Sequence, residues 1–96
     1  MADLDPIIHQ PMRLSIMAAL MVLEPRAQMD FTSLRELLRA TDGNLGAHLQ
    51  KLEEAGYIAV EKTFVGRKPR TFVAPTGKGR YAFEEHAKAL RAILGE

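Results

Sequence analysis

Apolar residues recur at helical spacing along most of the chain, beginning with a segment that is apolar on nearly every side. Met12–Leu23 is almost continuously apolar, with Pro11 suited to a first helical position and Pro25 to a stop. A helix that is apolar all round is buried all round. In so short a chain we expect a second subunit to provide part of that cover. The preceding Asp5–Gln10 is either a short helix or an extended lead-in.

Two further helices are predicted close together. The first spans Thr32–Ala40, with Thr32 or Ser33 as its cap and leucines on its inner face. A few residues with turn and cap chemistry follow. The next helix spans about Asp42–Ala55, with leucines at spacings of four and three, and Gly56 is its expected left-handed stop.

The apolar period then changes from 3.6 to 2, which indicates a β-hairpin. Residues 58–65 alternate, and Thr71–Ala74 is a second β-prone run. Gly66–Arg70 lies between them and is predicted to be a long hairpin loop. Thr76 can cap a last helix over roughly Gly77–Leu94, which carries a broad apolar stripe.

Length and composition limit the possible classes of protein. A chain of 96 residues with 47% hydrophobic residues fits one domain, residues 1–96, and excludes large cofactor domains. The absence of cysteine excludes disulfide scaffolds, thiolate metal sites and cysteine nucleophiles. No apolar run is long enough for a membrane span, and the acidic start is unlike a signal peptide. We therefore expect a soluble cytoplasmic protein.

Charge is unevenly distributed along the chain, although the formal total is only +1. Residues 1–56 carry five basic and eight acidic side chains, for a net charge of −3. Residues 57–80 carry six basic side chains and only Glu61, for a net charge of +5, and residues 81–96 have a net charge of −1. The positive charge is thus concentrated on the hairpin and just after it, where it could neutralise phosphates.

The order of elements is that of a winged helix-turn-helix, an α+β fold that is mainly α. The helix-turn-helix spans about residues 32–56, the two-stranded wing about 57–75, and the C-terminal helix about 77–94. A helix in this position can lie in a major groove, and a basic hairpin beside it can reach the neighbouring backbone or minor groove.

The motif TDGNL…HL…LE…GY, followed by GRKPRT and by T..G, resembles the compact winged-helix transcriptional regulators related to the MarR and ArsR groups. The similarity covers nearly the whole chain. It implies a homodimeric DNA-binding regulator joined through its first and last helices. One departure is Gly46-Ala47, where many relatives have Ser-Arg, so a strong guanine reader is missing from the middle of the helix.

Two sets of residues are therefore candidates for function. The DNA contacts fall on the helix starts, the recognition helix and the wing, where each residue could also be a plain cap or a solvated side chain: Thr32, Thr41, Asn44, His48, Lys51, Arg67, Lys68 and Arg70. The dimer contacts fall on the first and last helices: Ile16, Leu20, Leu23, Phe83, Leu90, Ile93 and Leu94.

The leading hypothesis is a sequence-specific DNA-binding transcriptional regulator that acts as a homodimer. The alternative is a winged-helix module for protein–protein contacts, which an apolar exposed wing would favour over a basic one. A small-molecule or metal sensor that also binds DNA is a third reading. His9, His48 and His86 lie in separate elements without ligand spacing, so no metal or cofactor is expected, and no motif indicates an enzyme. The sequence identifies no effector.

Overall fold

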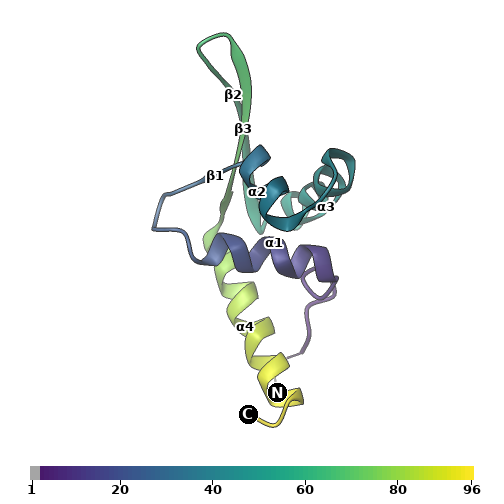
Figure 1. The fold of residues 1–96 in the computed structure, drawn as a ribbon. Coiled ribbons are helices and arrows are strands. Elements are labelled where there is room, and N and C mark those ends of the chain that lie inside the picture. The colour runs from purple at the N-terminus through teal and green to yellow at the C-terminus, as the bar shows by residue number, and fades with distance from the viewer. Residues whose placement is uncertain (1–2) are drawn as a thin grey trace.

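The computed structural model describes residues 3–96 and shows four helices and a three-stranded antiparallel sheet. In chain order the elements are α1 (Pro11–Met21), β1 (Met29–Asp30), α2 (Phe31–Leu38), α3 (Asp42–Glu54), β2 (Ile58–Val65), β3 (Lys68–Pro75) and α4 (Gly77–Ile93). The molecule is elongated, with extents of 50 × 26 × 21 Å. The wing rises at one end, and α4 extends toward the other (Figure 1).

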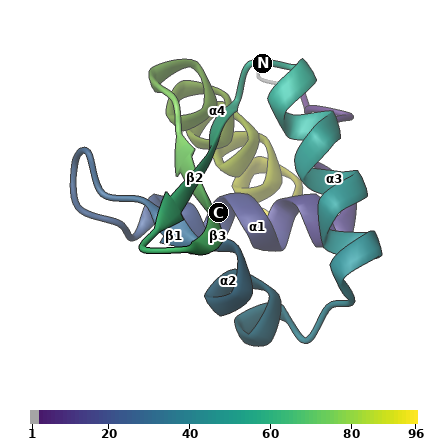
Figure 2. The same cartoon turned by 90° about the horizontal axis from the view of Figure 1, so that it is seen from above.

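Helix α1 lies at the centre of the protomer. It contacts α2, α3, α4 and β3, so neighbours from its own chain cover several of its faces. Figure 2 shows it passing between α3 and the wing, with α4 beside it. Ile16, Met17 and Leu20 are fully buried there. Its own chain therefore covers much of the apolar surface of this helix, so that feature alone does not require a partner subunit.

Helices α2 and α3 form the helix-turn-helix, with three residues between them. Asp30 caps α2 by accepting a hydrogen bond from the Ser33 N–H at 3.2 Å, so the predicted caps Thr32 and Ser33 were wrong by two or three positions. Arg39 closes α2 in the left-handed region at φ +53°, a conformation uncommon outside glycine. Thr41 caps α3 as predicted, accepting from the Asn44 N–H at 3.1 Å.

The sheet has the order β1-β3-β2. β2 and β3 pair along their whole length, from Ile58 opposite Pro75 to Val65 opposite Lys68. The hairpin turn therefore contains only Gly66 and Arg67, and the predicted five-residue loop was wrong. Gly66 has φ +66°, as tight hairpin turns of this kind require. β1 was not predicted, and it pairs only with the inner end of β3.

Residues 5–10 form a turn rather than a helix, and the Asp5 carboxylate accepts hydrogen bonds from the N–H groups of Ile7 and Ile8. The core joins this turn to α1, α2, α3 and the sheet. Its fully buried large apolar side chains are Ile8, Ile16, Met17, Leu20, Leu34, Leu45, Leu52 and Val73. This core fixes the position of α3 relative to the wing.

Candidate nucleic-acid interface

The outer face of α3 is open and sparsely covered. Leu45, Leu49 and Leu52 turn into the core, as predicted, which leaves the opposite face in solvent. Asn44 and Lys51 are exposed on that face. The other residues of this surface have no side chain or only a methyl group: Gly43, Gly46 and Ala47.

The two glycines of α3 have no packing role within the protomer. A Cβ built at Gly43 or Gly46 would meet no atom within 4 Å. Glycine inside a helix costs about 1 kcal/mol relative to alanine. Their presence therefore lowers helix stability without an internal benefit, and it keeps the outer surface of α3 close to the backbone.

The charges of α3 differ between its two ends. Asp42, in the first turn, pairs with Arg35 of α2 at 2.7 Å, and this hydrogen bond raises the pKa of the guanidinium. Glu53 and Glu54 are exposed at the C-terminal end. A polyanion is therefore repelled least at the N-terminal half, where the helix dipole also favours negative charge.

His48 is held more firmly than the sequence predicted. Its position off the leucine stripe predicts an exposed side chain, but His48 is half-buried and its Nδ1 lies 3.1 Å from Nη1 of Arg13. Because guanidinium only donates, Nδ1 must be the acceptor and the proton sits on Nε2. Burial lowers the pKa of His48, and the Arg13 charge lowers it further. Arg13 also donates to the Ile7 carbonyl, so it joins α3 to the N-terminal turn.

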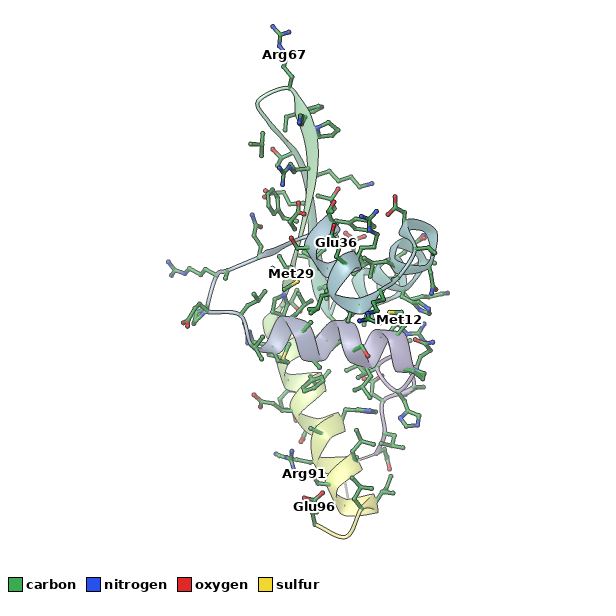
Figure 3. The ribbon with its side chains drawn as sticks, in the orientation of Figure 1. Met12, Met29, Glu36, Arg67, Arg91 and Glu96 are labelled. Carbon is green, nitrogen blue, oxygen red and sulfur yellow. The ribbon has the colours of Figure 1, made fainter. Side chains whose placement is uncertain are left out.

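The wing carries two kinds of cation. Arg67 projects from the turn at the tip (Figure 3). Arg67 and the adjacent Lys68 are both exposed, and neither forms an ion pair within residues 3–96. Arg70 lies nearer the body and pairs with Asp30 at 3.4 Å. Since Asp30 also caps α2, this contact ties the wing to the helix-turn-helix and partly neutralises Arg70.

A cleft of about 520 Å³ separates α3 from the wing. Besides apolar side chains, Gln50 from α3 and Lys62 from β2 line it, together with the acidic Glu53. Neither Gln50 nor Lys62 was among the predicted contacts. The strand alternation could have found Lys62, because Val60 and Lys62 share one face and Val60 packs against the core.

Thr32 lies in the first turn of α2, and Thr41 precedes α3; both side chains are exposed. Only Thr41 acts as a cap. The two hydroxyls therefore stand at the N-terminal ends of the two helices, where helix N–H groups can receive a phosphate.

The predicted dimer residues fall into three groups. Ile16 and Leu20 are fully buried in the protomer, so they stabilise its core and their assignment to a subunit interface was wrong. Leu23 and Phe83 pack partly against the core, and Leu90 is half-buried. The exposed members at the end of α4 are Ile93, at 66%, and Leu94, at 71%.

A polar cluster fastens the N-terminal turn to α4. The Asp5 N–H donates to Nδ1 of His86 at 3.0 Å, and the Tyr57 hydroxyl donates to the Asp5 carboxylate. His86 is 1% exposed, and within residues 3–96 its Nε2 has no hydrogen-bond partner. Burial lowers the pKa of His86, nearby His9 lowers it further, and Asp5 opposes both. Hydrogen bonding to Asp5, with some burial, raises the pKa of Tyr57 to about 12.

This cluster brings His9 and His86 together, with ring centroids 5.4 Å apart, although the sequence placed them in separate elements. His48 lies elsewhere, on Arg13. Among the described residues, no group of three or more His, Asp or Glu side chains is arranged to hold a metal ion.

Comparison with known proteins supports the geometry of a helix-turn-helix beside a basic wing. Residues 12–94 match the sequence model of the winged helix DNA-binding domain family. The chain belongs to this family. It is 39% identical over 80 residues to an uncharacterized protein of Methanocaldococcus jannaschii. The aligned region covers 83% of this chain and 84% of that protein.

Two solved structures share the winged-helix fold. The transcriptional regulator homologue protein from Pyrococcus horikoshii OT3 has a TM-score of 0.83 at 32% identity, covering 93% of this chain and 85% of the other. NadR, solved in complex with 4-hydroxyphenylacetate, has a TM-score of 0.69 at 22% identity, covering 94% of this chain and 64% of its own. The NadR likeness shows the fold alone.

The winged helix predicted from the sequence is therefore confirmed, as is its resemblance to transcriptional regulators. The protein is a winged-helix DNA-binding domain, in a family of DNA-binding proteins rather than of enzymes, and it resembles a solved transcriptional regulator homologue. In residues 3–96, none of the helices combines the length and the apolar character that crossing a membrane demands.

Proposed function

We propose that this winged helix regulates transcription as a homodimer that recognises a specific DNA sequence, with α3 in the major groove and the wing on the adjacent backbone or minor groove. The single observation that carries the proposal is the open face of α3 beside a hairpin whose tip bears cations that form no ion pair with any other residue of 3–96. The whole chain, residues 1–96, then acts as one DNA-reading unit.

The N-terminal half of α3 is the part best suited to enter the groove. Thr41 and Asn44 are exposed there, and the exposed carboxylates of Glu53 and Glu54 lie at the other end. Gly43 and Gly46 let the helix backbone approach the bases closely. With no arginine on this face, readout rests on Asn44 and on DNA shape, while Lys51 and the half-buried His48 serve the phosphates.

The wing supplies most of the binding free energy in this proposal. Arg67 and Lys68 can each neutralise a phosphate and release counterions. Arg70 contributes less, because Asp30 already pairs with it at 3.4 Å. Lys62, in the cleft between α3 and the wing, is an additional contact.

The dimer would use the far end of the molecule. Leu90, Ile93 and Leu94 recur at helical spacing on α4, and the last two are mostly exposed. In Figure 1 this end of α4 extends away from α1 and the wing. Burying such a stripe against a second copy would place two α3 helices on half-sites about 34 Å apart, or a multiple of that spacing.

Selection of bound sequences from a random DNA pool, followed by titrations at several salt concentrations, tests DNA recognition. Arg67→Ala should weaken binding and reduce the slope of log affinity against log salt by about one unit for each protomer, or about two units for the dimer. Arg91→Ala is the matched control, since it removes an exposed arginine at the opposite end of the molecule (Figure 3). Absence of binding at low salt, or an affinity that does not vary with salt, would contradict the proposal.

Light scattering tests the dimer separately. Ile93→Glu should convert a dimer to a monomer at micromolar concentration, because it places a charge within the apolar stripe. Leu37→Glu is the control, since Leu37 is similarly exposed, at 60%, but lies on α2. A wild-type monomer would refute the dimer and leave DNA binding by one chain to be tested on its own.

One observation favours the alternative of a protein-binding module. Phe64 and Val65, near the tip of the wing, are 69% and 55% exposed, so the wing is less polar than its cations suggested. Tight binding of wild-type protein to another protein, with no affinity for any DNA in the pool, would support this alternative.

A further inference from the structure

The outer part of the wing bears an aromatic side chain that the fold does not use. Phe64 is 69% exposed, whereas Val60, four residues earlier on the same strand, packs against the core. Exposed single apolar residues are common and need no explanation by themselves. Phe64 differs from such residues because of the face of the wing on which it lies.

The strand register places Phe64 on the face of the wing that is turned toward α3. Phe64 pairs with Pro69, so the two side chains lie next to each other on one face. Alternate residues share a face, and Val60 and Lys62 on this face line the cleft beside α3. The Phe64–Pro69 pair therefore continues the face that borders the proposed DNA site. Val65 points to the opposite face.

The length of the wing suits the distance between neighbouring grooves. Phe64 is six residues beyond the buried Ile58, which corresponds to about 20 Å of strand. With α3 in a major groove, the adjacent minor groove lies about half of the ~34 Å helical repeat away, or roughly 17 Å. The tip can therefore reach it.

The charge around Phe64 favours a nucleic acid over an apolar protein surface. No acidic residue occurs from Lys62 to Phe83, and three exposed cations surround the outer wing: Lys62 on the face of Phe64, Arg67 in the turn, and Lys68 on the opposite face. A cationic rim around an exposed ring matches a phosphate backbone on either side of a base step. Proteins that bend DNA through the minor groove insert apolar side chains, phenylalanine among them, in such settings.

We propose that Phe64, supported by Pro69, acts as an apolar wedge that enters the minor groove beside the α3 site and partly unstacks a base step. This inference rests on the proposed DNA binding and adds a deformation of the duplex to it. Pro69 restricts the neighbouring strand and so holds the ring at the tip without relying on the core. The wing then selects flexible base steps as well as neutralising phosphate.

The experiment uses the full chain and a duplex selected by the wild-type protein from the random pool, labelled at both ends for energy transfer. Phe64→Ala should weaken binding roughly 10- to 100-fold, the range for loss of an aromatic stacking contact, and reduce the bend. The salt slope should stay unchanged, because no charge is removed. Phe64→Leu should retain most of the bend, since leucine is also a wedge residue.

Val65→Ala is the matched control, because it removes an exposed apolar side chain from the other face of the same tip. Its affinity and bend should match those of the wild type. If Phe64→Ala binds and bends the duplex like the wild type, the wedge is wrong and the proposed function stands. If Phe64→Ala instead turns a dimer into a monomer without altering DNA binding, the ring contacts a second chain and the wedge is equally wrong. Failure of the wild type to select any duplex would refute the proposed function itself.

Discussion

Gly79, in the first turn of α4, offers a sharp test of how this helix is seated. It is buried, and a Cβ at this position would lie 2.0 Å from the carbonyl oxygen and 2.8 Å from the carbonyl carbon of Tyr57. Thr76, the cap of α4, holds the start of the helix against the same backbone segment. Its N–H donates to the Tyr57 oxygen at 3.1 Å, and its hydroxyl donates to the Gly56 oxygen at 2.7 Å.

The cost of Gly79→Ala follows from these distances. Carbon and oxygen atoms normally approach to about 3.3 Å, so α4 would have to move by more than about 1 Å. Overpacking of this kind costs about 1–3 kcal/mol, and the two Thr76 hydrogen bonds that would be strained contribute about 1 kcal/mol each. The higher helix propensity of alanine offsets about 1 kcal/mol of this loss in the free energy of unfolding. The expected net loss in free energy of unfolding is about 2–4 kcal/mol.

Gly77→Ala is the matched control, since it lies two residues earlier in the same turn and its Cβ would meet no atom within 4 Å. It should leave stability unchanged or raise it by up to about 1 kcal/mol. Urea and thermal denaturation followed by circular dichroism measure both variants. For a domain of this size the loss in Gly79→Ala corresponds to a melting temperature lower by roughly 10–30 °C. Equal stability of the two variants would refute this account of the seating of α4.

Three further predictions concern the titratable groups. Burial lowers the pKa of His86, so below pH 6.5 the unfolded chain binds a proton more readily than the folded protein does. The free energy of unfolding should therefore be unaffected by His86 above pH 6.5 and should fall below it. His86→Gln should lessen this fall, as measured by urea denaturation at several pH values. In the variant Tyr81→Phe, Tyr57 is the only tyrosine, and its absorbance should titrate near pH 12 rather than 10. The free energy of unfolding should decrease as the pH rises between these two values. A midpoint at pH 10 would exclude the hydrogen bond from Tyr57 to the Asp5 carboxylate. In Arg13→Ala the pKa of His48, followed by NMR, should rise because a neighbouring positive charge is removed, and an unchanged value would contradict the contact.

The sequence predicted most elements because their patterns are local. The leucines of α3 recur at helical spacing, and Thr41 and Thr76 are caps whose hydroxyls reach an N–H three residues on. The change to period 2 correctly located the wing. Each of these signals depends on residues within one or two turns of one another, so a single chain displays them directly.

The missed features depend on residues that are distant in sequence or on elements too short to show a pattern. β1 has two residues, fewer than an alternation needs. Lys68, Pro69 and Arg70 lie between the two β-prone runs, so the sequence pattern predicts a loop there. They belong to β3 at a level beyond β1, where only β2 pairs with it and a proline can be tolerated.

In the candidate site, too, the features that depend on local patterns could be predicted, and those that depend on distant residues could not. The exposed face of α3 follows from its leucine stripe and could be predicted. The Arg13–His48 contact spans 35 residues and the Arg70–Asp30 contact 40, so no local pattern indicated that His48 and Arg70 already have partners in the fold. The burial of Ile16 and Leu20 likewise depends on α1 being enclosed by elements from the whole chain.

These contacts assign different tasks to the two parts of the proposed interface. Along the wing, Arg70 is paired at the base, whereas Arg67 and Lys68 at the tip form no ion pair in the described part of the chain, so the free positive charge increases outward. On α3, Lys51 is outweighed by exposed carboxylates, and two glycines replace side chains that could reach bases. Affinity and its salt dependence should therefore arise at the wing, while α3 contributes register through close backbone fit. A protein organised in this way depends on the shape of its duplex more than on single base contacts.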